Sequence, residues 1–244
     1  MSTPSAVRAR GAADPAHDPL ANAVWHSLAG GHADLAERRG AAARYPRDVT
    51  VFAAVPDRPE PAAWTDLGHL VGPGRRAVLF RSRVEVPEGW SIEQDLRGVQ
   101  LVAPAGIGAL DGQVVALTED DRDEAGALVD LTRPGPWRPR TIEMGRYVGI
   151  RRRGRLVAMA GERLRPTGHV ELSAVCTAPD ARGRGLASRL VRHLVAAIEG
   201  DGAVAFLHAA ADNHPAIRLY EELGFVPSRE VTVTILRAAG APAR

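Results

Sequence analysis

Residues 175–190 read VCTAPDARGRGLASRL, and this stretch combines the end of a strand, a turn and the start of a helix. Gly183 and Gly185 stand among Arg182 and Arg184 at the point where the helical spacing begins. Glycine allows a ligand to approach the backbone closely, and the first turn of a helix offers N–H donors without partners. The pattern therefore favours an anion site, most often one for phosphate.

The residues after this turn predict an amphipathic helix that starts near Leu186. Six apolar side chains recur at the spacing of one helix face. They are Leu186, Leu190, Val191, Leu194, Val195 and Ile198.

Strands and helices alternate on both sides of this helix. Residues 117–131 predict a helix with Thr118 as N-cap and Asp121 three residues later. A second helix is expected over 213–225, with Pro215 in its first turn and Gly224 past its end. Strands are expected in a hairpin over 147–164 that turns near Gly154, and over 169–177, 203–209 and 229–237.

The first part of the chain mixes the same elements without a catalytic motif. The pattern predicts one or two helices over 20–45, broken near Gly30 and Gly31, and a short helix over 61–71. Strands are expected over 49–55, 76–86 and 99–104. The glycine-rich segment 104–113 suggests a boundary near residue 110. We therefore predict a disordered or extended tail over 1–19, an N-terminal α/β portion over 20–110 and a second domain over 111–244.

Composition excludes several classes of protein. The 244 residues are 45% hydrophobic and 25% charged with a net charge of +2, which gives little reason to expect nucleic-acid binding. All 31 basic residues are arginine, so the lysine of a P-loop or a Schiff base is missing. Cys176 is the one cysteine, there is no apolar run of membrane-spanning length, and the N-terminus lacks a hydrophobic signal segment. We expect a cytoplasmic protein.

Three known kinds of phosphate site use a glycine-bearing helix start. A P-loop is excluded, and a dinucleotide fingerprint would need Ser188 in place of its third glycine or alanine. The third pattern is R-x-x-G-x-A, formed by Arg182, Gly185 and Ala187. It resembles the acyl-CoA pyrophosphate turn, Q/R-x-x-G-x-G/A, of the GCN5-related N-acetyltransferase (GNAT) superfamily. Downstream, NHPAIRLYEELGF resembles the superfamily helix N-x-x-A-x-x-L-Y-E-x-x-G-F, and the resemblance extends over roughly 117–237.

The resemblance implies an α/β fold with a mixed, twisted sheet, helices on both faces and acetyl-CoA as acyl donor. The segments LHAAADN and LYEELGF are closest to the FR47-like branch. In this family the backbone after the turn binds pyrophosphate, the strand before it contacts pantetheine, and the motif asparagine binds the cofactor or caps the helix. The implied cofactor contacts are Val175, Thr177, Arg182, Gly183, Arg184, Gly185, Leu186, Ala187 and Asn213.

The resemblance also implies catalytic roles. Tyr220 matches the tyrosine beside the cofactor sulfur, where it would hydrogen-bond the leaving thiolate. Glu171 matches a general base, although it could act through water or simply pair with an arginine. His208 is an alternative base or a structurally satisfied histidine. Cys176 is interpreted as a small buried hydrophobe rather than an acyl-enzyme nucleophile, and no spacing resembles a metal site.

We therefore predict transfer of an acetyl group from acetyl-CoA to a primary amine by direct attack in a ternary complex. The alternatives are a larger acyl-CoA, as in glycine N-acyltransferases, and a non-catalytic acyl-CoA-binding module. The acceptor is a small-molecule or peptide amine, with specificity set by the first helix, the final strands and the loop 132–140 around Trp137, and Glu143 could face it. By analogy alone, the N-terminal portion is a degenerate GNAT-like half that lines the acceptor cleft or a homodimer interface. No nucleic-acid or membrane partner is expected, and the arginine-rich run 151–155 is interpreted as a solvated turn.

Overall fold

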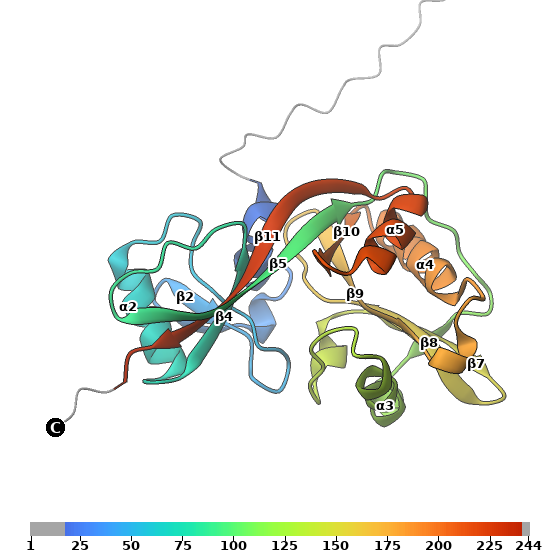
Figure 1. The fold of residues 1–244 in the computed structure, drawn as a ribbon, viewed down its shortest axis with the longest axis horizontal. Coiled ribbons are helices and arrows are strands. Elements are labelled where there is room, and N and C mark those ends of the chain that lie inside the picture. Colours follow the sequence, from blue (N-terminus) through green and yellow to red (C-terminus); the bar gives the residue numbers. More distant parts are fainter. Residues whose placement is uncertain (1–17, 241–244) are drawn as a thin grey trace, which may run out of the picture.

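The computed structural model describes residues 18–240, in which a long mixed sheet is bordered by helices (Figure 1). The eight-stranded sheet has the order β4-β11-β5-β10-β9-β8-β7-β6, and a three-stranded sheet has the order β1-β2-β3. The strands are β1 (Glu37–Arg39), β2 (Ala42–Arg44), β3 (Ala53–Ala54), β4 (Arg76–Arg81), β5 (Trp90–Val102), β6 (Val115–Leu117), β7 (Tyr147–Arg152), β8 (Arg155–Glu162), β9 (His169–Thr177), β10 (Val204–Ala210) and β11 (Val226–Ala238).

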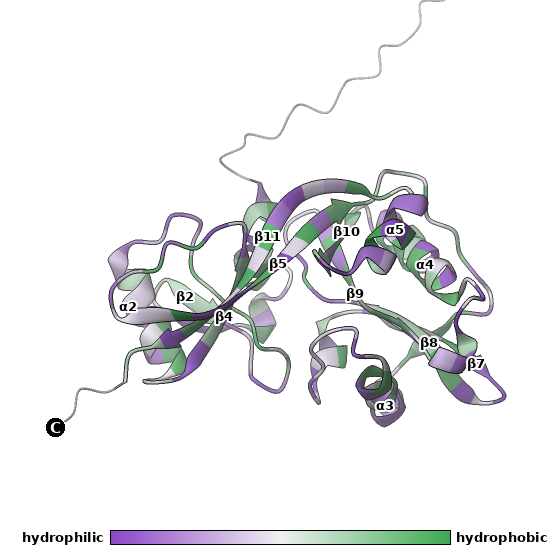
Figure 2. Ribbon diagram, viewed as in Figure 1, coloured by the Kyte–Doolittle hydropathy of each residue, from purple (hydrophilic) through white to green (hydrophobic). Residues whose placement is uncertain are grey.

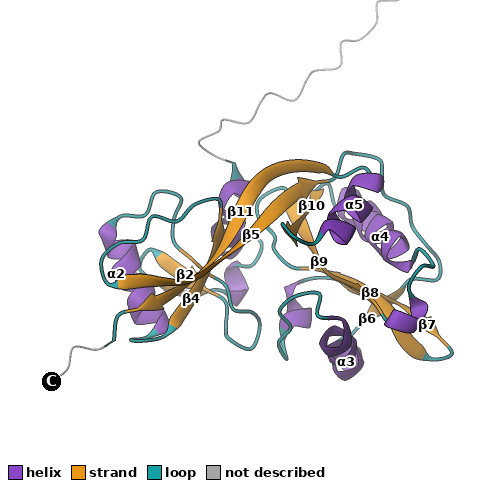
Figure 3. Ribbon diagram, viewed as in Figure 1, coloured by secondary structure: helices purple, strands orange, loops and turns teal. Residues whose placement is uncertain are grey.

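The helices flank both faces of the large sheet. The α-helices are α1 (Ala23–Ala29), α2 (Pro61–Val71), α3 (Arg122–Thr132), α4 (Leu186–Gly200) and α5 (His214–Glu222). The 3-10 helices are η2 (Pro19–Asn22), η3 (Ala33–Leu35), η4 (Glu119–Asp121), η5 (Thr141–Met144) and η6 (Pro179–Ala181). Helix α3 covers one face of the strands β7 to β9, and α4 with α5 covers the other (Figure 3). Within residues 18–240, no helix is long and apolar enough to cross a membrane.

Strand pairing makes this a mixed sheet, as predicted. Strands β9 and β10 run parallel, whereas β10 pairs with β5 in the antiparallel direction. The long strands β5 and β11 pair from Trp90↔Ala238 to Val102↔Val226 and cross the molecule from one side to the other.

The core predicted for α4 is confirmed residue by residue. Leu186, Leu190, Val191, Leu194, Val195 and Ile198 are the buried residues of this helix. They join one cluster with the apolar faces of α3 and of strands β7 to β10, and the apolar side of the helix faces the sheet (Figure 2). Burying a leucine or valine side chain contributes about 1.5–3 kcal/mol, so this face fixes the helix on the sheet.

The other C-terminal elements also follow their predicted ranges. The hairpin β7–β8 turns at Arg153 and Gly154, and α5 begins after Asn213. Thr118 and Asp121 form a reciprocal capping box ahead of α3, as expected from their spacing. Helix α2 has the predicted bounds and ends before Gly72.

The structure differs from the sequence prediction in the first 50 described residues. Helix α1 ends at Ala29, and part of the second predicted helix is instead the hairpin β1–β2. Glu37 and Arg44 are directly opposite in that hairpin, and their side chains form an ion pair of 2.6 Å. The predicted strand 49–55 contains only β3 of two residues.

The structure does not test residues 1–17 of the predicted tail or the predicted boundary near residue 110. Residues 1–17 of the tail lie outside the described residues, while Asp18 caps η2 through a hydrogen bond to the N–H of Leu20. The boundary stays a prediction. It falls between β5 and β6, and β5 on its N-terminal side pairs with β10 and β11 on its C-terminal side.

Candidate active site

The turn before α4 exposes its backbone. Gly183 and Gly185 have φ angles of 71° and 69°, the left-handed region that side chains disfavour. A Cβ atom added to either glycine would meet no heavy atom within 4 Å. Arg182 and Arg184 are exposed beside them. The space in front of the turn is therefore open to a ligand.

The N-terminus of α4 faces this space with its free N–H groups and with the positive end of the helix dipole. Gly185 is the N-cap and supplies no side-chain cap, and the first helical bond runs from the N–H of Arg189 to the carbonyl of Gly185 at 3.1 Å. The N–H groups of Leu186 and Ala187 therefore precede any helical bond, while the Leu186 side chain is buried in the core. Such a helix start is suited to an anion.

Strands β9 and β10 separate just ahead of the turn. Their parallel pairing runs from His169↔Val204 to Leu172↔Leu207 and stops there. A register shift against β8 follows in β9, where Ala174 has a φ of 53°. Val175 and Thr177 lie half-buried in this separated end of β9. An extended ligand can thus reach backbone groups between two strands that no longer pair.

Glu171 is buried on the paired part of β9 and bound on both oxygens. The Nε and Nη2 atoms of Arg163 donate to its carboxylate at 2.8 and 2.5 Å. Its Oε1 also lies 2.6 Å from Nδ1 of His208. Burial alone would raise the pKa of Glu171, but Arg163 and His208 outweigh it and hold the pKa at about 2. This environment favours the arginine-pairing alternative over direct proton uptake.

His208 is the first residue of β10 after the end of its pairing with β9. Its Nε2 lies 2.9 Å from Nε2 of Gln100, so the neutral ring donates from Nδ1 to Glu171 and accepts at Nε2. Its ring centroid is 4.2 Å from that of Phe80. Burial lowers the pKa of His208 below its usual value, against the opposing effect of Glu171. The imidazole is therefore neutral at pH 7.

Tyr220 and Cys176 are buried, whereas Asn213 caps the start of α5. Tyr220 is buried in α5 against Phe225, and burial raises its pKa to about 12. Burial also raises the pKa of Cys176, so its thiol stays protonated as expected for a small core side chain. The side chain of Asn213 accepts from the N–H of Ala216 at 3.3 Å, which is the capping alternative.

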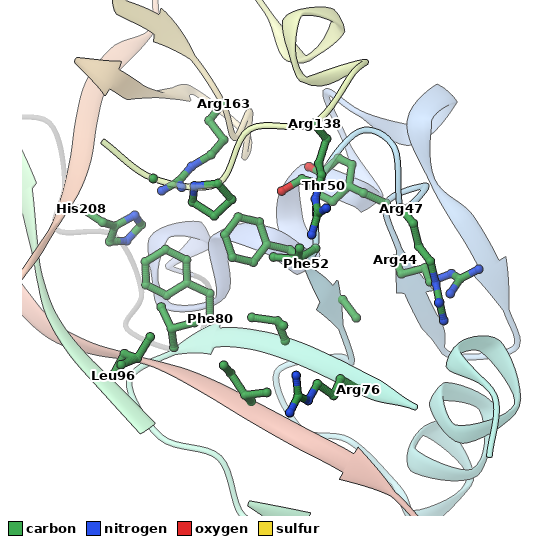
Figure 4. A pocket seen from close by; sticks show the side chains of 18 of the residues that line it. Arg44, Arg47, Thr50, Phe52, Arg76, Phe80, Leu96, Arg138, Arg163 and His208 are labelled. Atoms are coloured by element: carbon green, nitrogen blue, oxygen red, sulfur yellow. The ribbon is translucent and has the colours of Figure 1, made fainter. Parts of the chain in front are cut away.

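A cavity of about 1000 Å³ borders His208 on the side of the N-terminal portion (Figure 4). It is lined by strands β4, β5, β10 and β11, by residues near β2 and β3, and by Pro134, Gly135, Pro136 and Arg138. The sequence pointed to this last loop, but Trp137 itself packs on Tyr147 at 5.3 Å between ring centroids. Glu143 pairs with Arg140 at 2.7 Å.

Sequence reasoning missed Phe52, Phe80 and Arg163 as cavity residues. No local signal marks them, because each belongs to an ordinary apolar or charged segment and they meet only in the folded sheet.

The arginine-rich run 151–155 lies outside the cavity. Arg151 forms ion pairs with Asp121 and Glu124 at the surface.

Comparisons with known proteins find acetyltransferases among the relatives of this chain. Residues 147–233 match the family model of FR47-like proteins. N-alpha-acetyltransferase RimI of Mycobacterium tuberculosis is 34% identical over 121 residues, which are 45% of this chain and 75% of that protein.

Solved structures extend the likeness to nearly the whole chain. A protein of Novosphingobium aromaticivorans, assigned to the GNAT-family acetyltransferases, is 39% identical with a TM-score of 0.82, over 91% of this chain and 100% of that one. A GCN5-related N-acetyltransferase of Kribbella flavida shares the fold at 21% identity and a TM-score of 0.61, over 91% of this chain and 96% of that one. With its open glycine turn, its separated strands and these relatives, the chain belongs to the GNAT family and is an acyl-CoA-dependent acetyltransferase, with a segment similar to FR47-like proteins over 147–233.

Proposed function

We propose that this protein transfers the acetyl group of acetyl-CoA to a primary amine by direct attack in a ternary complex. The observation that carries the proposal is the end of β9–β10 pairing after Leu172 and Leu207, because β9 leads from there to the open turn of α4 and β10 continues with His208, which lines the cavity. The donor and the acceptor would then meet where the two strands separate.

The open turn would hold the pyrophosphate of acetyl-CoA. Backbone N–H groups from Gly183 to Ala187 would donate to it, and Arg182 and Arg184 would add positive charge. Hydrogen bonds to charged groups are worth about 1.5–3 kcal/mol each, so the backbone contributes more than the helix dipole of about 0.3–1 kcal/mol. The pantetheine arm would lie along Val175 and Thr177. Asn213 would then support the site through the cap of α5.

Acetyl-CoA supplies a thioester carbonyl at the end of this arm. A backbone N–H near Val175 would stabilise the negative charge that develops on the carbonyl oxygen. The amine nitrogen forms the new N–C bond, the C–S bond breaks, and CoA leaves as the thiolate. Tyr220 would hydrogen-bond that thiolate. Its pKa of about 12 lies above that of a thiol, so it stabilises charge better than it gives up its proton.

The amine must lose a proton during the reaction. Because Glu171 is ionised and held by Arg163, we propose that it orients His208 and that His208 takes the proton at Nε2. Protonation of Nε2 requires the Gln100 amide to turn. The Oε1 atom of Gln100 is buried without a hydrogen-bond partner in residues 18–240, and it could then accept from the protonated ring.

Turnover tests this function. Acetyl-CoA is incubated with the protein and a panel of amines, and CoA and N-acetyl product are separated and quantified. The proposal predicts equal amounts of both, dependent on protein and amine. Acetyl-CoA binding without amine-dependent CoA release from any panel member would indicate a non-catalytic acyl-CoA-binding module. Release only from longer acyl-CoAs would replace the acetyl group by a larger acyl donor.

A further inference from the structure

The cavity beside His208 has an unusual charge distribution. Eight arginines line it, and no aspartate or glutamate does. The chain as a whole is nearly balanced, with 31 basic and 29 acidic residues, so this imbalance is local. A concave site with one sign of charge attracts ligands of the opposite sign.

Ion pairing does not neutralise these arginines completely. Five of them pair with carboxylates that lie outside the lining, two of the five sharing Glu93. Arg47, Arg75 and Arg138 have no carboxylate partner among residues 18–240. Arg47 donates to the carbonyl of Val71 at 3.1 Å, and the guanidinium of Arg138 makes no hydrogen bond within that part of the chain. The cavity therefore keeps guanidinium donors for a ligand.

Aromatic side chains separate the two ends of the cavity. The rings of Phe52 and Phe80 stack with centroids 5.8 Å apart, and Arg163 lies over both at 5.3 and 5.9 Å. In Figure 4, His208 lies on one side of this pair and Arg47 on the other. A ligand that fills the cavity must therefore place an apolar body against the phenylalanines.

We propose that the amine acceptor carries an anionic group, a carboxylate or a phosphate, separated from the amine by an apolar segment. The inference rests on the proposed function, which puts the amine at His208. The apolar segment lies over Phe52 and Phe80, and Arg138 and Arg47 bind the anion. Guanidinium groups suit this role because they bind planar carboxylates and phosphates through two parallel hydrogen bonds. A volume of about 1000 Å³ is at the upper end of what encloses a small molecule.

Matched amines test the charge requirement. Tyramine is compared with tyramine phosphate, and 2-(4-methylphenyl)ethylamine with 4-(2-aminoethyl)benzoate, each with saturating acetyl-CoA. We expect kcat/KM at least tenfold higher for the anionic member of a pair, with the advantage shrinking as salt is added. The better of the two anionic amines distinguishes a phosphate acceptor from a carboxylate acceptor. Equal or better turnover of the neutral members would overturn the inference while leaving acetyl transfer intact.

Variants assign the effect to this cavity. Arg138→Gln should raise KM for the anionic amines about tenfold, and Arg47→Gln combined with it should raise KM further. KM for the neutral amines and the Kd of acetyl-CoA should stay unchanged. The control is Arg152→Gln, which removes an exposed arginine of β7 outside the cavity. If Arg138→Gln weakens acetyl-CoA binding instead, the arginine serves the donor and the inference fails.

A binding measurement tests the anion site separately from the proposed acetyl transfer. Calorimetric titration of the anionic amines is run on the wild type and on Arg138→Gln, with acetyl-CoA absent. Binding to the wild type that is weakened in the variant, without any turnover, would keep the anion site and reject the proposed reaction. Absence of both binding and turnover would reject the anion site.

Discussion

The carboxylate of Glu171 lies 2.6 Å from Nδ1 of His208 and accepts two hydrogen bonds from Arg163, so one buried acidic side chain joins two strands and the cavity wall. Arg163 follows β8, Glu171 is in β9 and His208 is in β10. Loss of the negative charge would leave Arg163, whose side chain is only 13% exposed, without its ion-pair partner. The cluster therefore links stability to the geometry of the proposed acceptor side.

The first prediction concerns this ion pair. Glu171→Gln should lower the free energy of unfolding at pH 7 by roughly 3 kcal/mol, because breaking a buried pair leaves an uncompensated charge. The folded pKa of Glu171 lies at about 2, below its ordinary 4.5. Its contribution is therefore complete above pH 4.5 and is lost as the pH falls towards 2. Urea unfolding at pH 7 and at pH 3.5 measures this, and the difference between wild type and variant should shrink at the lower pH.

Glu222→Gln serves as the control, because Glu222 is exposed at the end of α5. It should change the free energy of unfolding by less than about 0.5 kcal/mol. A loss at Glu171 no larger than the loss at Glu222 would contradict the structural role given to the cluster.

The second prediction concerns proton removal from the amine. His208→Gln should lower kcat about 100-fold, since positioned acid–base groups contribute at least that much. Burial lowers the pKa of His208, and the ring must be neutral to accept a proton. For the wild type, kcat should therefore fall as the pH drops below 6.5. Above pH 6.5, the titration of His208 should not change kcat. A variant with wild-type kcat and the same acid limb would show that the amine loses its proton to solvent.

The third prediction concerns the leaving thiolate. Tyr220→Phe should lower kcat about 100-fold and leave the KM of acetyl-CoA nearly unchanged, because the hydroxyl acts on charge that develops during the reaction. The ring packing on Phe225 is kept in the variant, so the midpoint of thermal unfolding should move little. An unchanged kcat would reduce Tyr220 to a core residue of α5.

The fourth prediction compares backbone with charge in the turn. Gly185→Val should raise the Kd of acetyl-CoA at least tenfold, since valine is strained at a φ of 69° and its side chain projects into the open space. Arg184→Ala should have a smaller effect, because the backbone N–H groups supply the stronger hydrogen bonds. Titrations of both variants with acetyl-CoA, with the unfolding midpoint of each free protein as a check on folding, measure the difference. The reverse order would assign the binding energy to the arginine.

Local patterns predicted much of the C-terminal part of the chain. The buried face of α4, the capping box of Thr118 and Asp121, and the turn near Gly154 each depend on residues a few positions apart. The glycine turn was predicted for the same reason, together with the motif in α5. These elements form the proposed acyl-CoA side of the site.

The proposed acceptor side depends on contacts between residues that are far apart in the sequence. Phe52 and Arg163 are more than 100 residues apart, and the arginine lies over the ring only in the folded chain. The partner of Glu171 was open for the same reason, although Arg163 precedes it by eight residues. Strand β5 is longer than its apolar pattern because pairing with β11 continues over exposed residues. Elements set by tertiary pairing therefore escaped prediction.

Thermal unfolding with and without saturating acetyl-CoA tests the central claim most directly. At 100 times its Kd, a ligand that binds only the folded state adds about 2.7 kcal/mol. For a chain of this size that corresponds to a rise of roughly 5–10 °C in the unfolding midpoint. We expect this rise for the wild type and a much smaller one for Gly185→Val. No rise with acetyl-CoA, CoA or longer acyl-CoAs would mean that the glycine turn is only the start of a helix, and the assignment of this site would be wrong.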